Sequence, residues 1–178
     1  MNLAEQLVIS LVCHEVGDYC LQSDWQAAEK TQPGNRGFVS TAVHVVCYTL
    51  PFLIITRNPL ALLFIAATHF VIDHWRLARF VCWAKNFISP RQSVITEFVP
   101  AHRQPMPVAE VSSTGTPRAP HDDVMTRTVT WWYPWAECSK TGYPPNKPDW
   151  MAVWLMIRAD ACMHYVCNFS ILWMAYGR

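Results

Sequence analysis

A chain of 178 residues is long enough for one hydrophobic core and too short for two of comfortable size. Hydrophobic residues make up 52% of it and charged residues only 15%, whereas soluble domains carry about 25% charged residues, and this shortfall favours a protein of the lipid bilayer. The net charge of +1 gives no basic field of the kind that nucleic-acid binding needs, so we set nucleic acid aside as a partner.

Two helices are predicted in the first third of the chain. The first covers residues 3–30 and stops before the helix-breaking residues 33–35, Pro-Gly-Asn. The second covers residues 38–56, which contain no Asp, Glu, Lys or Arg and are long enough to cross a hydrocarbon core of about 30 Å. Pro51 should kink this helix, and membrane helices tolerate such a kink.

Two further helices complete the predicted fold. Residues 59–86 begin with a proline at the first helical position, are apolar at first and become amphipathic afterwards. Residues 150–176 follow Asp149 as the expected N-cap. The fold class is therefore all-α: a four-helix up-down bundle, embedded in a membrane, with helices 1–3 in residues 1–86 and helix 4 in residues 150–178.

A long proline-rich insertion separates helices 3 and 4. Residues 87–149 hold ten of the thirteen prolines and are expected to be irregular, with one short strand within residues 126–138 and a flexible part at residues 112–123. Such a long connection is either a lid or a linker. The aromatic cluster at residues 131–135 suits a lid, and equally a segment that rests on the membrane surface.

Polar side chains recur four residues apart in these apolar helices. This spacing stacks two side chains on one helix face, and helical bundles build metal sites in this way. In an up-down bundle, the reversed order of Asp and His in helix 4 brings all three aspartates into one layer and their histidine partners into the next. Carboxylates in a low dielectric also need a partner cation. The predicted metal ligands are His14, Asp18, His44, His69, Asp73, Asp160 and His164.

Imidazole and carboxylate ligands without thiolates favour zinc, manganese or iron, as one or two divalent ions. Such a cluster activates water and polarises a carbonyl or phosphoryl oxygen, so hydrolysis is the expected chemistry. The cysteines occupy apolar stretches without a CxxC pair and are expected to be reduced thiols.

Other polar residues near the cluster are candidates either for hydrogen bonds that support the metal ligands or for contacts with a small anionic or lipid-like substrate: Gln22, His74, Arg76, Lys85 and Asn168. Arg76 and Lys85 suit an anionic group such as phosphate, or else a positive collar that flanks the membrane. The insertion side carries more Lys and Arg than the opposite side, so the positive-inside rule places it on the cytoplasmic face of the cytoplasmic membrane.

Three segments resemble motifs of the DUF3307 family of small bacterial and phage proteins: HEVGDYCLQSDWQAAEK, HFVIDHWRL and ADACMHYVCN. The layout is also similar to that of the YdjM/YbcI-type membrane-bound metal-dependent hydrolases. Tyr19 stands where the family usually has Phe, and Arg76 where it has Lys. The resemblance leaves the insertion unmatched. It supports as site residues His14, Asp18, Gln22, His44, His69, Asp73, Asp160 and His164.

Three functions are consistent with these patterns. The first is a membrane-embedded metal-dependent hydrolase that acts on a phosphoester or an amide. The second is a soluble or peripheral metal-dependent enzyme that acts on a nucleotide or nucleobase derivative. The third is a non-enzymatic membrane protein that binds or transports metal.

Overall fold

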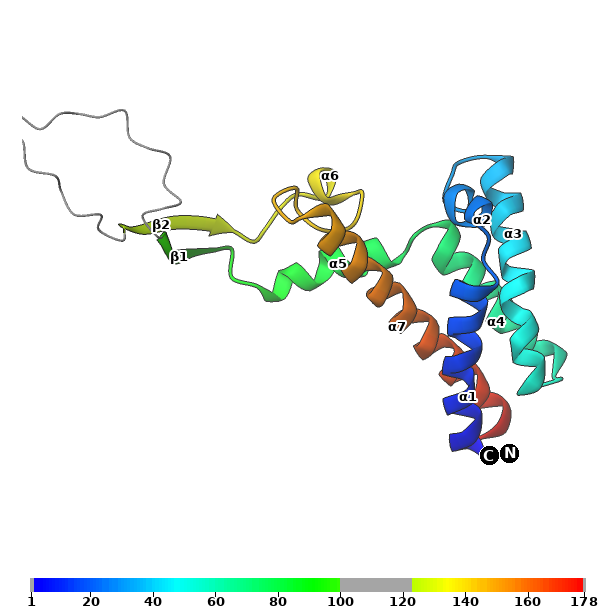
Figure 1. Ribbon diagram of the computed structural model, residues 1–178. Coiled ribbons are helices and arrows are strands. Elements are labelled where there is room, and N and C mark those ends of the chain that lie inside the picture. Colours follow the sequence, from blue (N-terminus) through cyan, green and yellow to red (C-terminus); the bar gives the residue numbers. More distant parts are fainter. Residues whose placement is uncertain (1, 100–122, 178) are drawn as a thin grey trace, which may run out of the picture. The chain divides into compact units, whose positions relative to one another are not determined.

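A computed structural model describes residues 2–99 and 123–177 (Figure 1). The chain folds as two units, residues 1–85 with 135–178 and residues 86–134. The first unit is helical and contains every predicted site residue. The second is built on a β-hairpin and is shorter than the insertion predicted from the sequence.

The first unit is a set of helices that pack side by side. Helix α7 contacts α1, α4 and α5, while α3 contacts α4 and α2. Both chain termini lie at the same end of this unit, as the N and C marks in Figure 1 show. Its elements are α1 (Leu3–Glu15), a π-helical turn (Val16–Cys20), α2 (Asp24–Glu29), α3 (Asn35–Thr49), a 3₁₀ turn (Leu50–Ile54), α4 (Pro59–His74), α5 (Ala78–Ala84), α6 (Trp135–Cys138) and α7 (Asp149–Tyr176), and a further 3₁₀ turn (Lys85–Ile88) leads into the second unit.

The prediction of one continuous helix over residues 3–30 is wrong. The chain leaves α1 through the π-helical turn, and α2 starts anew with a capping box in which Ser23 and Gln26 each accept the other's backbone N–H. Gly17 makes the turn fit, because a Cβ at this position would lie 2.7 Å from Tyr48 Cδ2. Turns of the π type often mark functional sites, and this one carries Asp18.

The predicted third helix is also broken. Helix α4 ends at His74, and the segment from Ala78 to Ile88 is bent by 63° from it. Arg76 lies at the corner with a φ of 48°, in the left-handed region that costs a residue with a Cβ about 1–2 kcal/mol. The corner therefore stores backbone strain at an arginine.

This strain predicts an unusual order of stability. Arg76→Gly should be more stable than Arg76→Ala by about 1 kcal/mol, because the two variants lose the same guanidinium and differ in the Cβ that disfavours a positive φ. Chemical denaturation of both variants measures the difference. At Arg79, inside α5, the order should be reversed by a similar amount. The same order at both positions would contradict a strained corner.

Two details of the other helices follow local chemistry. Helix α3 tightens into a 3₁₀ turn at Pro51, where the sequence predicted a kink. Helix α7 has Pro148 as its N-cap and begins at Asp149, so the predicted N-cap is one residue too late.

All seven cysteines are free, and three of them are buried.

The helices bury polar residues beside an apolar core, and they expose many large apolar side chains. The buried residues of α1 include Gln6, Ser10 and His14, whereas Val8 is 64% exposed and Val46 of α3 is 63% exposed. Buried polar residues and exposed large apolar side chains are the two departures from an ordinary soluble core that carry information. Among the described residues, the segment Asn35–Ile54 is long and apolar enough to cross a membrane. The helical segments Pro59–His74 and Ala78–Ile88, which meet at a bend, are a second candidate if they are counted together as one span.

The second unit contains an antiparallel pair, β1 (Gln92–Val99) and β2 (Asp123–Thr130), in which Gln92 faces Thr130 and Val99 faces Asp123. The expectation of a single strand missed β1. The segment 112–123, expected to be flexible, lies outside the described residues except for Asp123. Beyond β2, the Trp132 indole N–H donates to the Ser89 carbonyl.

Candidate metal centre

Four helices bring four histidines to one level of the first unit. His14, His44, His69 and His164 each lie about three turns, or ~16 Å, from the end of their helical segment nearest the chain termini. Each is at most 1% exposed. The spacing of four residues then places an aspartate one turn further on in three of the helical segments, so the layered arrangement expected from the sequence has a structural basis.

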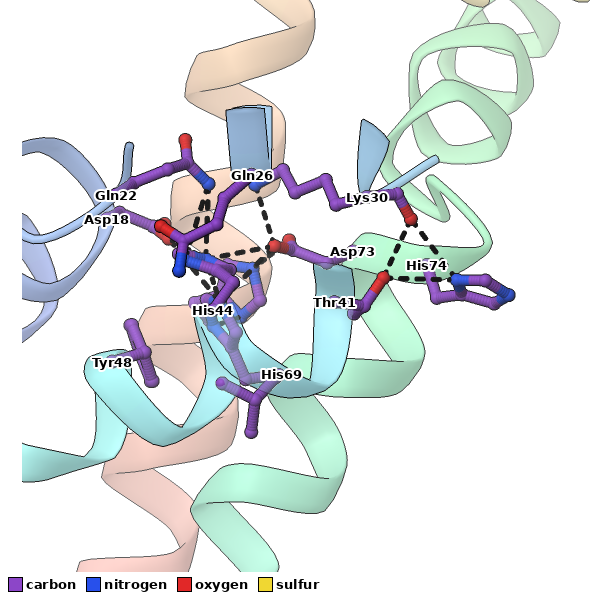
Figure 2. A network of polar contacts seen from close by, with 12 residues as sticks. Asp18, Gln22, Gln26, Lys30, Thr41, His44, Tyr48, His69, Asp73 and His74 are labelled. Atoms are coloured by element: carbon purple, nitrogen blue, oxygen red, sulfur yellow. Dashed lines mark hydrogen bonds and ion pairs between the residues drawn. The ribbon is translucent and has the colours of Figure 1, made fainter. Parts of the chain in front are cut away.

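Two of these histidines and two aspartates form a compact group, drawn in Figure 2. The Nε2 atoms of His44 and His69 are 3.0 Å apart. Asp18 Oδ1 lies 3.0 Å from His44 Nε2 and 3.4 Å from His69 Nε2. Asp73 Oδ2 lies 3.3 Å from each of the same two nitrogens. All four atoms lie within 4.8 Å of one another. We call these atoms the four-atom group.

The four-atom group has the dimensions of a tetrahedral metal site. Metal–ligand bonds of about 2.0–2.1 Å place neighbouring ligands of a tetrahedron about 3.3 Å apart. Five of the six separations in the group, 3.0–3.4 Å, agree with this value, and the sixth joins the two carboxylates. The donor set, two imidazoles and two carboxylates, suits a divalent transition metal.

A second group shares one residue with the first. Asp160 and His164 of α7 approach Asp18 so that one ligand atom from each lies within 4.8 Å of the others. His164 Nε2 lies 3.3 Å from Asp160 Oδ2 and 3.2 Å from Asp73 Oδ1. His164 thus links Asp160 to a carboxylate of the four-atom group.

Lys30 is a site residue that the sequence-based ligand set omitted. Its ammonium donates to Asp73 Oδ2 at 2.7 Å, and its carbonyl accepts hydrogen bonds from Thr41 Oγ1 and His74 Nδ1 (Figure 2). Burial disfavours the charged form of Lys30, but the charges of Asp73 and Asp18 outweigh burial and raise its pKa. The signal was present, because Lys30 ends the first motif.

His14 lies beside the four-atom group and not within it. Asn168 Nδ2 donates to the Tyr48 hydroxyl at 2.8 Å, which leaves the hydroxyl proton for His14 Nδ1 at 3.0 Å. The other nitrogen, His14 Nε2, lies 3.5 Å from Asp18 Oδ2 and makes no hydrogen bond to it. His14 Nε2 is buried without a hydrogen-bond partner among the described residues, so its predicted role as a ligand stays a prediction.

A cleft of about 330 Å³ opens onto the carboxylates. Of the predicted substrate contacts, Gln22 and Arg76 line it. Lys85 bonds to the Tyr143 hydroxyl instead, while Asn168 contacts Tyr48 and His74 contacts the Lys30 carbonyl. The further lining residues are Asp18, Tyr19, Ala27, Lys30, Thr31, Asp73, Ala78, Val153, Met156, Ile157 and Asp160.

Comparison with known proteins identifies one family. Residues 6–99 match the family model of DUF3307, described as a protein of unknown function. This match covers the four-atom group, Lys30 and Arg76, and it ends before α7. No curated protein and no solved structure matches the chain. Because the match spans more than half of the residues of this chain, the chain belongs to the DUF3307 family.

Proposed function

We propose that this protein is a membrane-embedded, metal-dependent hydrolase in which α1, α3, α4 and α7 form a four-helix bundle around one divalent ion. The observation that carries the proposal is the four-atom group, whose separations of 3.0–3.4 Å match a tetrahedral site. Two imidazole nitrogens 3.0 Å apart can share only one proton, so a bound cation satisfies both better than a hydrogen bond does.

Charge balance supports a single ion. Asp18, Asp73 and Asp160 supply three negative charges around the site, and Lys30 supplies one positive charge. One divalent ion brings the sum to zero with all histidines neutral. A second divalent ion would leave two uncompensated positive charges among apolar helices, which is costly.

The membrane setting rests on the buried polar residues and the exposed large apolar side chains of the helices. A bilayer accommodates apolar side chains such as Val8, Ile54 (74% exposed) and Leu63 (62% exposed) on the outer faces of the helices. The polar residues then face the bundle interior, where intramembrane ionisable groups are normally found. In this setting the ~16 Å from the helix ends to the histidine level is about half of a 30 Å hydrocarbon core.

The residues around the cleft suit hydrolysis. An ion in the four-atom group would have to take a water as a fifth ligand, and it would lower the pKa of that water to about 7. Asp160 lines the cleft, its side chain is 25% exposed, and one of its oxygens is held by His164 at 3.3 Å. Asp160 is thus placed to accept a proton inside the cleft.

The test compares two aspartates of the same helix. Metal-loaded protein in detergent is assayed with p-nitrophenyl phosphate, bis(p-nitrophenyl) phosphate and an anilide. Asp160→Asn should retain the ion and lose about 100-fold or more in turnover. Asp149→Asn, an exposed change at the start of α7, should behave as wild type. Metal-loaded wild type without metal-dependent turnover on any ester or amide would contradict the hydrolase.

Metal transport is a second candidate, and the depth of the site favours it. A buried ion about halfway along apolar helices resembles the sites of transporters. Uptake of metal by proteoliposomes tests this function, and uptake that is lost in Asp73→Asn without any hydrolysis by wild type would replace the enzyme with a transporter.

A further inference from the structure

Arg76 gives the cleft a cation that the metal centre does not use. It lines the cleft beside Lys30. Lys30 is engaged by Asp73 at 2.7 Å, whereas in the described part of the chain the Arg76 guanidinium reaches only a sulfur, Met156 Sδ, at 3.7 Å. A guanidinium carries five N–H donors in a fixed fork, so most donors of Arg76 are left for a ligand.

The backbone at Arg76 also indicates a need for its side chain. A positive φ at a residue with a Cβ is costly, and such residues cluster at functional sites. Glycine would satisfy the corner between α4 and α5 without that cost. An arginine there places a cation on the cleft wall, three residues after the Asp73 ligand.

The charges that line the cleft are incomplete without an anion. The three carboxylates, Lys30 and one divalent ion sum to zero, so Arg76 leaves one positive charge in excess. An anionic group bound beside Arg76 would neutralise it in a largely apolar surrounding. Val153, Met156 and Ile157 of α7 form an apolar wall next to this position, which suits the organic part of an ester.

We propose that the cleft binds the phosphoryl group of a phosphate ester, and that Arg76 holds its oxygens next to the metal ion. A phosphoryl group is tetrahedral, so some of its oxygens can meet the guanidinium fork while another faces the ion. A neutral amide offers no charge for Arg76. The inference rests on the proposed function, because the ion forms the opposite side of the phosphoryl site.

The test measures the affinity of metal-loaded full-length protein for inorganic phosphate by isothermal titration. Arg76→Gln should weaken phosphate binding at least tenfold while the metal content stays at the wild-type value. The control is Arg158→Gln, which removes an exposed arginine of α7 that does not line the cleft and should change the affinity less than twofold. Equal affinities of wild type and Arg76→Gln, or equal losses in both variants, would overturn the inference.

Two further measurements keep the test decisive. If Arg76→Gln fails to fold, Arg76→Lys takes its place, because it retains the charge and loses the planar fork of the guanidinium. It should bind phosphate with an affinity between those of wild type and a variant without the charge. Wild-type affinity in Arg76→Lys would overturn the role of the fork. If butyl phosphate binds more tightly than inorganic phosphate, the substrate is an amphiphilic phosphate ester. If the two bind with equal affinity, the substrate is a water-soluble ester. A wild-type protein that holds no metal defeats the proposed function; a loaded protein that binds no phosphate defeats only this inference.

Discussion

Asp73→Asn is expected to lower metal affinity about 100-fold or more. Asp73 is 3% exposed and uses both oxygens: Oδ2 faces His44 and His69 at 3.3 Å, and Oδ1 faces His164 at 3.2 Å. Asparagine keeps the shape and removes the charge, which in a buried site is worth several kcal/mol. Competition with a chromogenic chelator measures the change in metal dissociation constant.

The matched control for this prediction is Asp24→Asn. Asp24 is exposed on α2 and belongs to neither ligand group, so its variant should bind metal as wild type does. Helical content from circular dichroism should be the same in both variants. Full metal retention by a folded Asp73→Asn protein would remove Asp73 from the ligand set and with it the tetrahedral interpretation of the four-atom group.

Lys30→Met is expected to destabilise the metal-free protein by about 3 kcal/mol and the metal-loaded protein much less. The Lys30 ammonium and the Asp73 carboxylate form a pair in which the side chains are 18% and 2% exposed, and removal of one partner leaves a buried charge without compensation. A divalent ion supplies that compensation, and binding to the folded state alone adds stability. Thermal unfolding with chelator and with saturating metal measures both effects.

Lys140→Met is the control for this experiment, because Lys140 is exposed on the same unit and lines no ligand group. It should unfold as wild type under both conditions. A loss of stability in Lys30→Met that metal does not reduce would mean that the ammonium and the ion do not stabilise the same carboxylates.

The spacing of polar residues predicted much of the site. His69 and Asp73 on α4, and Asp160 and His164 on α7, lie four apart on continuous helix, so periodicity alone brought them to one face. The prediction succeeded there because a regular helix transmits spacing into geometry. His44 was found as a lone polar residue in an apolar segment.

The same logic failed where the helix is irregular. The π-helical turn after Glu15 shifts the phase of the helix face, so Gln22 lies beyond the helix, in the connection to α2, and contacts His44 at 3.3 Å. The corner at Arg76 and the role of Lys30 depend on contacts between segments far apart in the chain. Sequence periodicity carries no information about such contacts. The expected helix over residues 3–30 also overlooked the capping pattern of Ser23 and Gln26, which marks the start of α2.

The hairpin was missed for a compositional reason. Prolines dominate the average over residues 87–149, whereas residues 92–99, QSVITEFV, are rich in the β-branched and aromatic residues that favour strands. A shorter window over this region would have indicated β1 as a strand.

The most direct test of the metal centre is X-ray absorption spectroscopy of the purified, metal-loaded protein. We predict a first coordination shell of nitrogen and oxygen only, at about 2.0–2.1 Å if the metal is zinc, with the outer-shell scattering of two imidazoles from His44 and His69. Sulfur at about 2.3 Å would assign the ion to the cysteines instead. Such a shell, or protein that stays metal-free after reconstitution, would contradict the account.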